Sequence, residues 1–355
     1  MRALIKLVNN ENETPEPNVT IDAEMTLKYP ILGSSALRPT DKQLLANRLS
    51  TLEENAIVLG KYLCRGGNGV IFTGRHQQQD IAIKVCERAQ QLENEMIVSA
   101  NFSHPNVMSF IRLHTNDTKI LAMELADADL LGHMKATAKS SQVFGLKCVR
   151  VLFAHIVGGV QHMHSRHFAH LDLKPQNVLI TRNVSTGAIG VKICDFDFTQ
   201  SSHELDGRLI ECVVDYGTDY YSAPEIVSKR KSRDKRSADV WALGVMLYQM
   251  VTFHYPYHPL AFGSDDKRFL KAKEHFFAHQ LSHIYERLPN NYGDQCVPQT
   301  VAIDETVRVL KRFLSANDAT RESLDSLLGD PWFESRALQP HDCDERRSLV
   351  HTEHM

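Results

Sequence analysis

The sequence predicts an α+β protein in which an antiparallel sheet with one helix precedes a larger helical part. Three patterns predict this order. Over residues 57–124, strand-like runs rich in β-branched and aromatic residues alternate with turn residues. Within that stretch, over about 89–100, apolar residues recur near helical spacing. From Cys148 onward the apolar residues recur mainly with a helical period. The chain therefore divides into two lobes of different secondary structure.

The first lobe is expected over residues 56–124. Its strand-like runs are LGKYLCRGGNGVIFTGR, DIAIKV and KILAMEL. Residues 1–55 before it show no sustained period of 2 or 3.6. We expect them to form a mostly irregular N-terminal extension, although the short apolar piece 44–49 can dock on the folded body.

The second lobe is expected over residues 125–335. Helical periodicity marks the segments 149–164, 238–251, 269–285 and 306–314. The strand-like pieces NVLI and VKIC flank the turn NVSTGAIG, which predicts a hairpin within this lobe. The composition turns polar after Pro331-Trp332-Phe333, so we expect residues 336–355 to form a C-terminal tail.

Composition excludes several classes of protein. The 355 residues are 43% hydrophobic and 23% charged, which is typical of globular chains rather than disordered or fibrous ones. A net charge of −3 gives no global attraction for nucleic acid or anionic lipid. The longest apolar run, 240–251, is too short to cross a bilayer, and the N-terminus lacks the pattern of a signal peptide. Seven scattered cysteines without a CxxC pair predict reduced thiols in an intracellular protein.

A glycine-rich stretch lies between two strand-like runs. In LCRGGNGVIF, Gly66, Gly67 and Gly69 let the backbone approach phosphate oxygens and direct N–H groups at them. An ordinary hairpin turn has the same composition. Lys84 ends the run DIAIK and places a cation one strand beyond the loop. Strand lysines are commonly solvated, so neither feature alone distinguishes a phosphate site.

The string HLDLKPQN at residues 170–177 carries more specific chemistry. Placed between a helix and a hairpin, Asp172 can orient a hydroxyl, Lys174 can neutralise a phosphate and Asn177 can hold a metal. Asp195 ends the strand-like piece VKIC and offers the oxygen ligands that Mg²⁺ prefers. A carboxylate, an amide and a lysine in this arrangement predict a phosphoryl-transfer site.

With these motifs the chain resembles the eukaryotic-type protein kinases of the serine/threonine class over about 57–333. The family's motifs appear in order: LCRGGNGVIF for the glycine-rich loop, AIK for the VAIK strand, LAMELADADL for the hinge, HLDLKPQN for HRDLKxxN, DFD for DFG, GTDYYSAPE for the APE segment and SADVWALG for the DxWxxG helix. The resemblance implies a bilobal protein kinase fold. It consists of an N-terminal antiparallel lobe with one regulatory helix and a larger helical C-terminal lobe.

The resemblance also implies an ATP site. Lys84 would hold the α- and β-phosphates and pair with Glu95, with Glu93 as a close rival for this pairing. Met123 stands at the gatekeeper position and Glu124 at the adenine-binding hinge. The implied nucleotide-binding residues are Cys64, Gly66, Gly67, Asn68, Gly69, Ile71, Ala82, Lys84, Glu95, Met123, Glu124, Ala126 and Asp129.

Asp172, Lys174 and Lys84 are the implied catalytic residues. Asp172 would accept or orient the proton of the substrate hydroxyl, and Lys174 would stabilise the transferring group. Asn177 and Asp195 would bind Mg²⁺.

Two structural contacts follow from the same resemblance. Glu225 of the APE motif should pair with Arg321 of a later helix, and Asp239 of the DxWxxG helix should brace the catalytic loop. Both contacts can be checked directly in a structure.

Three departures from the family pattern bear on function. Cys64 replaces the first glycine of the loop and adds a side chain near the nucleotide. Asp197 replaces the glycine of DFG, and aspartate tolerates left-handed dihedrals, so the metal-binding turn can still form. Leu171 replaces the arginine of HRD, which receives a phosphate on the activation segment in kinases that have it. We therefore expect phosphorylation within 195–225 not to be the principal switch.

The implied function is transfer of the γ-phosphoryl group of MgATP to Ser or Thr hydroxyls of proteins. The alternative is a catalytically weak, pseudokinase-like scaffold that binds nucleotide and partner proteins. It is disfavoured because Lys84, Asp172, Asn177 and Asp195 are all present. A small-molecule kinase is disfavoured by the APE and DxWxxG motifs, which resemble the peptide-docking apparatus.

The expected partners are ATP, protein substrates and a regulatory protein, with no nucleic acid and no membrane insertion. The expected location is the cytoplasm, with the nucleus as an alternative. The basic run KRKSRDKR at 229–236 can serve as an import signal or bind acidic substrates, although a solvated loop is the favoured interpretation.

Overall fold

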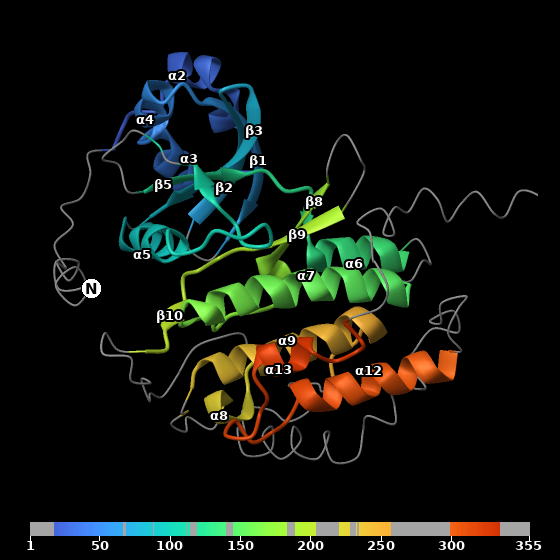
Figure 1. The fold of residues 1–355 in the computed structure, drawn as a ribbon. Helices are drawn as coiled ribbons and strands as arrows, with labels where there is room; N and C mark the ends of the chain where they lie inside the picture. Colours follow the sequence, from blue (N-terminus) through green and yellow to red (C-terminus); the bar gives the residue numbers. More distant parts are fainter. Residues whose placement is uncertain are drawn as a thin grey trace, which may run out of the picture. The chain divides into compact units, whose positions relative to one another are not determined.

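The computed structural model describes residues 18–66, 69–87, 89–111, 113, 119–139, 145–182, 189–203, 220–227, 232, 234–256 and 299–333. This part of the chain forms two compact units. Unit 1 contains the described residues up to Ala100 and those of Ser109–Leu125. Unit 2 contains Asn101–Met108 and the described residues from Ala126 onward. Figure 1 labels most of the helices and strands of both units.

Unit 1 ends at Leu125, close to the boundary expected between the two lobes. The expected extent of the first lobe is wrong in one segment: Asn101–Met108 lies within the predicted first lobe but belongs to unit 2. Its end is bound to a strand of unit 2, because the N–H of Met108 donates to the carbonyl oxygen of Ile193 at 2.8 Å. The N–H of Ile193 in turn donates to the carbonyl oxygen of Asn106 at 2.9 Å.

Unit 1 is built on an antiparallel sheet of five strands, in the order β1-β2-β3-β5-β4. The strands are β1 (Val58–Arg65), β2 (Gly69–His76), β3 (Gln79–Cys86), β4 (Phe110–Ile111) and β5 (Ile120–Glu124). One helix, α5 (Ala89–Ser99), follows β3 in the chain. The predicted antiparallel sheet with one inserted helix is therefore confirmed.

The N-terminal extension is helical where the structure describes it, so the expectation of mostly irregular structure over 1–55 is wrong for residues 18–55. Its elements are α2 (Ala23–Lys28), the 3₁₀ helix η1 (Pro30–Gly33), α3 (Pro39–Ala46) and α4 (Leu49–Glu54). Local signals start two of them. The side chain of Asp22 accepts a hydrogen bond from the N–H of Met25 at 2.8 Å, and Pro39 occupies the first turn of α3.

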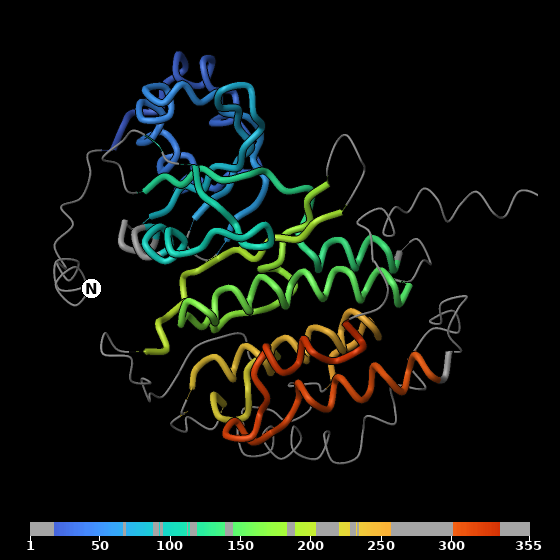
Figure 2. The backbone as a smooth tube through the Cα atoms, in the orientation of Figure 1, coloured from blue at the N-terminus to red at the C-terminus, as the bar shows by residue number. Residues whose placement is uncertain are grey.

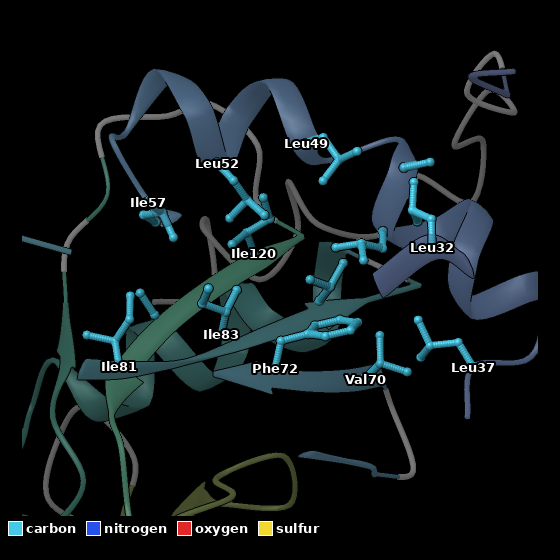
Figure 3. Packing of buried hydrophobic residues seen from close by; sticks show 14 residues of the cluster. Leu32, Leu37, Leu49, Leu52, Ile57, Val70, Phe72, Ile81, Ile83 and Ile120 are labelled. Atoms are coloured by element: carbon cyan, nitrogen blue, oxygen red, sulfur yellow. The ribbon is translucent and has the colours of Figure 1, made fainter. Parts of the chain in front are cut away.

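These helices cover one face of the sheet. Val70 and Phe72 of β2 and Ile81 and Ile83 of β3 lie on that face and are buried. They form one hydrophobic cluster with leucines of the extension, which are Leu32, Leu37, Leu45, Leu49 and Leu52. Figure 3 shows side chains from the helices and from the sheet meeting in this cluster. The expected docking of the piece 44–49 is thus confirmed, because burial on the sheet stabilises helices too short to persist alone.

Unit 2 is mainly helical. Its helices are α6 (Leu130–Lys139), α7 (Leu146–Ser165), the 3₁₀ helix η2 (Pro175–Asn177), α8 (Pro224–Val227), α9 (Arg236–Thr252), α12 (Gln299–Phe313) and α13 (Leu324–Leu328). Its strands are β6 (Ala128–Asp129), β7 (Phe168–Ala169), β8 (Val178–Arg182), β9 (Ile189–Ile193) and β10 (Gln200–Ser201). The predicted hairpin corresponds to β8 and β9, which pair antiparallel.

The core of unit 2 is centred on α9, in which every residue from Ala238 to Thr252 is buried. Helices α7 and α12 both contact α9, and Figure 2 traces their backbones beside it. These three helices confirm the segments 149–164, 238–251 and 306–314. The predicted segment 269–285 and the tail 336–355 lie outside the described residues. Within the described part of the chain, no helix combines the length and apolarity needed to cross a membrane.

Candidate active site

Five predicted nucleotide-binding residues lie on the sheet face opposite the hydrophobic cluster. Directly paired residues of antiparallel strands point to the same face of a sheet. Cys64 pairs with Ile71, and Ile71 pairs with Lys84. Ala82 pairs with Met123 and lies two residues before Lys84 in β3, so this pair shares the same face. The sheet register therefore places these residues together within unit 1.

Lys84 forms a buried ion pair with the helix that follows its strand. Its Nζ donates to Oε2 of Glu95 in α5 at 2.7 Å, and the two side chains are 11% and 3% exposed. The predicted pairing with Glu95 is confirmed, while the side chain of the rival Glu93 lies outside what the structure describes. A lysine and a glutamate removed from water remain charged when each neutralises the other. The pair therefore holds an ammonium group at a fixed place on the sheet.

The glycine-rich loop is described at its stem. The N–H of Gly66 donates to the carbonyl oxygen of Gly69 at 3.0 Å. Gly69 must lack a side chain, because a Cβ there would collide with the carbonyl oxygen of Val85 on the neighbouring strand. The predicted residues Gly67 and Asn68 lie outside the described residues.

The predicted hinge residues follow one another where β5 ends and unit 2 begins. Glu124 ends β5, and its Oε1 accepts a hydrogen bond from Oγ of Ser109 at 3.0 Å. Ala126 precedes β6 and is half-buried. Asp129 ends β6, and its Oδ1 accepts from the N–H of Gly132 at 2.7 Å, which caps the first turn of α6. The adenine and ribose contacts of these residues stay predictions.

Asp172, Lys174 and Asn177 come together in unit 2. Nζ of Lys174 donates to Oδ2 of Asp172 at 2.6 Å. Nδ2 of Asn177 donates to the same Oδ2 at 3.1 Å and to the carbonyl oxygen of Asp172 at 2.9 Å. Asp172 and Asn177 are 5% and 4% exposed. One carboxylate is therefore held by a cation and an amide in a setting with little water, as the motif predicts.

The structure adds His170, to which the sequence reasoning gave no role. The residue is completely buried. Its Nδ1 accepts from the N–H of Asp172 at 3.3 Å, and its Nε2 lies 3.1 Å from the carbonyl oxygen of Cys194. His170 thus links the loop of Asp172 to the residue before Asp195. Its place at the start of HLDLKPQN was the signal that could have revealed it.

Asp195 lies at the same end of the β8–β9 hairpin as Asn177. Val178 pairs with Ile193, and the N–H of Cys194 donates to the carbonyl oxygen of Asn177 at 3.0 Å. Oδ1 of Asp195 is buried and has no hydrogen-bond partner in the described part of the chain. A buried carboxylate oxygen without a donor costs free energy, and a hard cation removes that cost. Asn177 and Asp195 therefore fit a Mg²⁺ ion.

The backbone of the DFD motif is left-handed at its first residue rather than at its last. Asp197 was expected to tolerate a left-handed conformation, but it is not among the described residues with positive φ. Instead Asp195 has a φ of 67° and Leu171 a φ of 68°. The replacement of the family's glycine by Asp197 therefore introduces no left-handed strain at that residue.

Asp239 binds the catalytic loop through its backbone, as predicted. Its Oδ1 accepts from the N–H of Leu171 at 2.8 Å, and its Oδ2 accepts from the N–H of His170 at 2.8 Å. Nε2 of His164 lies 2.8 Å from the same Oδ2. Asp239 is 1% exposed. This buried carboxylate stabilises the left-handed backbone of Leu171 just before Asp172.

Glu225 and Arg321 form the predicted ion pair, and both side chains are completely buried. Arg321 was expected in a helix, but it lies between α12 and α13. The pair is bidentate, with Nη1 of Arg321 at 2.7 Å from Oε1 of Glu225 and Nη2 at 3.0 Å from Oε2. Arg321 also donates to the carbonyl oxygens of Ser237 at 2.7 Å and Ser315 at 2.8 Å. Glu225 lies in α8 and Ser237 in α9, so the guanidinium ties α8 to the start of α9.

The comparisons with known proteins agree with this geometry. The sequence model described as the protein kinase domain matches residues 57–333. The chain is 30% identical over 281 residues to serine/threonine-protein kinase SRK2G of Arabidopsis thaliana, which covers 77% of this chain and 72% of that protein. It is also 30% identical to serine/threonine-protein kinase SRK2H of the same plant, with 77% and 70% covered.

A relative with a longer chain is CBL-interacting protein kinase 5 of Oryza sativa subsp. japonica. It is 27% identical over 292 residues, which cover 79% of this chain and 56% of the rice protein. This chain thus matches little more than half the length of that relative.

Proposed function

The chain belongs to the protein kinase family and is a serine/threonine-protein kinase, and we propose that Asp172, Lys174 and Lys84 carry out its phosphoryl transfer. The γ-phosphoryl group of ATP passes to a Ser or Thr hydroxyl of a protein substrate. The observation that supports these roles most directly is the 2.6 Å contact between Lys174 and the buried carboxylate of Asp172.

In this mechanism Asp172 acts on the attacking hydroxyl. The hydroxyl oxygen forms a bond to the γ-phosphorus, and the bond between that phosphorus and the β–γ bridging oxygen breaks. The hydroxyl proton goes to the carboxylate of Asp172, and ADP leaves with the electron pair. Lys174 donates a hydrogen bond to the carboxylate of Asp172 before the reaction and neutralises charge on the group in transfer. Lys84, fixed by Glu95, holds the α- and β-phosphates.

Protein kinases as a family use ATP together with Mg²⁺, which neutralises charge on the phosphate oxygens when bound. We assign its ligands to Asp195 and Asn177. The unpartnered Oδ1 of Asp195 supports this assignment. Nδ2 of Asn177 donates to Asp172, so its Oδ1 is the atom that would serve as a ligand.

A transfer assay tests these roles. Purified protein is incubated with radiolabelled ATP, Mg²⁺ and generic protein substrates, beside the variants Asp172→Ala and Lys84→Met. Both variants should lower transfer by about 10²–10⁴-fold, since each removes a group that acts in the transition state. Lys61→Met, an exposed lysine on β1, is the matched control and should retain activity.

The same assay separates the alternative function. A pseudokinase-like scaffold would bind nucleotide without transferring label to the protein substrate. The background radioactivity on the substrate would then be equal for the wild type and for Asp172→Ala. No described feature of the site favours this alternative. Label on Ser or Thr of the protein substrate in the wild type, lost in both variants, supports the kinase mechanism.

Partners and location are part of the proposal. Protein substrates and ATP follow from the family, and the name of the rice relative, CBL-interacting protein kinase 5, supports a regulatory protein partner here. We place the protein in the cytoplasm, with import into the nucleus through the basic run 229–236 as the alternative. Microscopy of the tagged chain, with and without alanines in that run, distinguishes the two.

A further inference from the structure

Residues 18–55 lie outside the match to the protein kinase domain, which begins at residue 57. They nevertheless belong to unit 1, and their leucines complete its hydrophobic cluster. Helix α3 contacts β3, α4 contacts β1 and η1 contacts β1. The extension therefore packs on the strands that carry the predicted ATP-binding residues.

One ion pair joins the extension to the glycine-rich loop. Asp41 of α3 is 2% exposed, and its Oδ1 accepts from Nη1 of Arg65, the last residue of β1. Nη2 of Arg65 also donates to Oε1 of Glu87 at 2.7 Å. On the other side, Nε of Arg38 donates to Oδ2 of Asp41 at 3.2 Å. Asp41 is thus a buried carboxylate between two guanidinium groups, one of which precedes Gly66.

The loop stem is bound to the extension on both of its sides. On the incoming side Arg65 is paired with Asp41. On the outgoing side Val70, which pairs with Arg65 in the sheet, is completely buried in the cluster that includes Leu37 of the extension. Figure 3 shows Leu37 and Val70 among the side chains of this cluster. The hydrogen bond between Gly66 and Gly69 closes the stem between these two attachments.

Burial makes the ion pair a constraint on geometry. The side chain of Asp41 is 3% exposed, while that of Arg65 is 27% exposed. Removing Arg65 from this position would leave a desolvated carboxylate with one guanidinium partner fewer, so movement of the stem away from α3 is costly. An exposed surface pair would impose no comparable constraint, because solvent replaces each partner easily.

We propose that α3 of the N-terminal extension positions the glycine-rich loop for ATP, with Asp41 acting through Arg65 as a positioning residue. This inference rests on the proposed function, since it assigns a role in binding the nucleotide of that reaction. Asp41 touches no substrate. Its effect is on the affinity for ATP, whereas Asp172 and Lys174, which act on the hydroxyl and on the group in transfer, lie in unit 2.

The test compares Asp41→Asn with Arg65→Met and Arg65→Lys in the full chain. The dissociation constant of MgATP is measured by calorimetry, and kcat and both KM values are measured in the transfer assay. Asp41→Asn and Arg65→Met should raise the dissociation constant and KM of ATP about five- to tenfold, with kcat and the KM of the protein substrate within about twofold. Arg65→Lys keeps the charge and should give a smaller increase.

Glu53→Gln is the matched control, because Glu53 forms an exposed ion pair with Lys28 at 2.6 Å in the same extension. It should leave ATP affinity unchanged. The inference is overturned if ATP affinity is unchanged in Arg65→Met, whose altered side chain is partly exposed, or if Glu53→Gln has the same effect. Circular dichroism shows whether Asp41→Asn still folds. If it does not, Arg65→Met tests the same ion pair from the other side. Wild type that binds MgATP without transferring phosphate contradicts the proposed function, while the binding comparison still decides the role of Asp41.

Discussion

Replacing Asp239 by asparagine tests whether one buried carboxylate holds the catalytic loop in place. Its two oxygens accept from the N–H groups of His170 and Leu171, and Oδ2 also lies within hydrogen-bond distance of His164. Asparagine has nearly the same shape and retains one oxygen. Its NH₂ group, however, must face a donor in either orientation of the amide.

The expected cost follows from these contacts. A hydrogen bond to a charged group contributes about 1.5–3 kcal/mol. Asp239→Asn removes the charge from all three contacts. In at least one of them, the NH₂ group of asparagine would face another hydrogen-bond donor. We therefore expect a loss of about 3 kcal/mol in the free energy of unfolding. The left-handed conformation costs roughly 1–2 kcal/mol in a residue such as Leu171. The substitution also weakens the hydrogen bond that stabilises this conformation. Asp172 would then shift, and kcat should fall about 10²-fold.

Urea unfolding and the phosphoryl-transfer assay measure the two effects. Asp325→Asn is the matched control, because Asp325 is exposed and bonds only the side chain of Gln161 among the contacts described for it. The control should change neither quantity appreciably. An Asp239→Asn protein with wild-type stability and with kcat within about threefold of wild type would refute the reasoning.

Three further predictions follow from unit 2. Arg321→Lys keeps a charge beside Glu225 but loses the bidentate contact, and urea unfolding should show a loss of about 3 kcal/mol. Because Leu171 replaces the phosphate-binding arginine, phosphatase treatment should leave activity within about twofold; abolition of activity, restored by one phosphate within 195–225, would contradict this. Burial lowers the pKa of His155 below its ordinary value of 6.5, so the unfolded chain binds the proton more tightly and the free energy of unfolding should fall as the pH drops below about 6.5. In urea titrations at pH 7.5 and 5.5, His155→Gln should reduce the difference between the two free energies of unfolding. An unchanged difference would contradict this role of His155.

The contacts of the site were predictable where a motif fixes the residue types on both sides. Lys84 and Glu95 were expected to pair because AIK and the glutamate of the following helix resemble family motifs that pair, and the structure has this ion pair. The pairs of Glu225 with Arg321 and of Asp239 with the catalytic loop were expected from the same resemblance. The physical reason is that a buried charge needs a defined partner, so the residue types on both sides of such a contact belong to the motif.

The helices of the extension were not predictable in the same way. The α-helices α2, α3 and α4 are six to eight residues long, which is too short for a helical period to stand out. Their stability comes from leucines buried against a sheet formed by later residues, and this tertiary contribution has no local signature. Pro39 after Arg38 and the capping Asp22 were the available signals.

Backbone conformation was the least predictable property of the site. Leucine has no intrinsic preference for the left-handed region, so nothing in HLDLKPQN indicates the φ of 68° at Leu171. The surrounding hydrogen bonds impose it. Aspartate does tolerate that region, and this was considered for Asp197, whereas the structure has the positive φ at Asp195.

The helices that cover the sheet also decide where this chain can be shortened. A protein that starts at residue 57, where the family match starts, would leave Phe72, Ile81 and Ile83 facing water instead of leucine side chains. Contiguous apolar surface of this kind promotes self-association and poor solubility. For recombinant production, a soluble version of the domain therefore has to begin upstream of Leu32, the first buried leucine of this cluster.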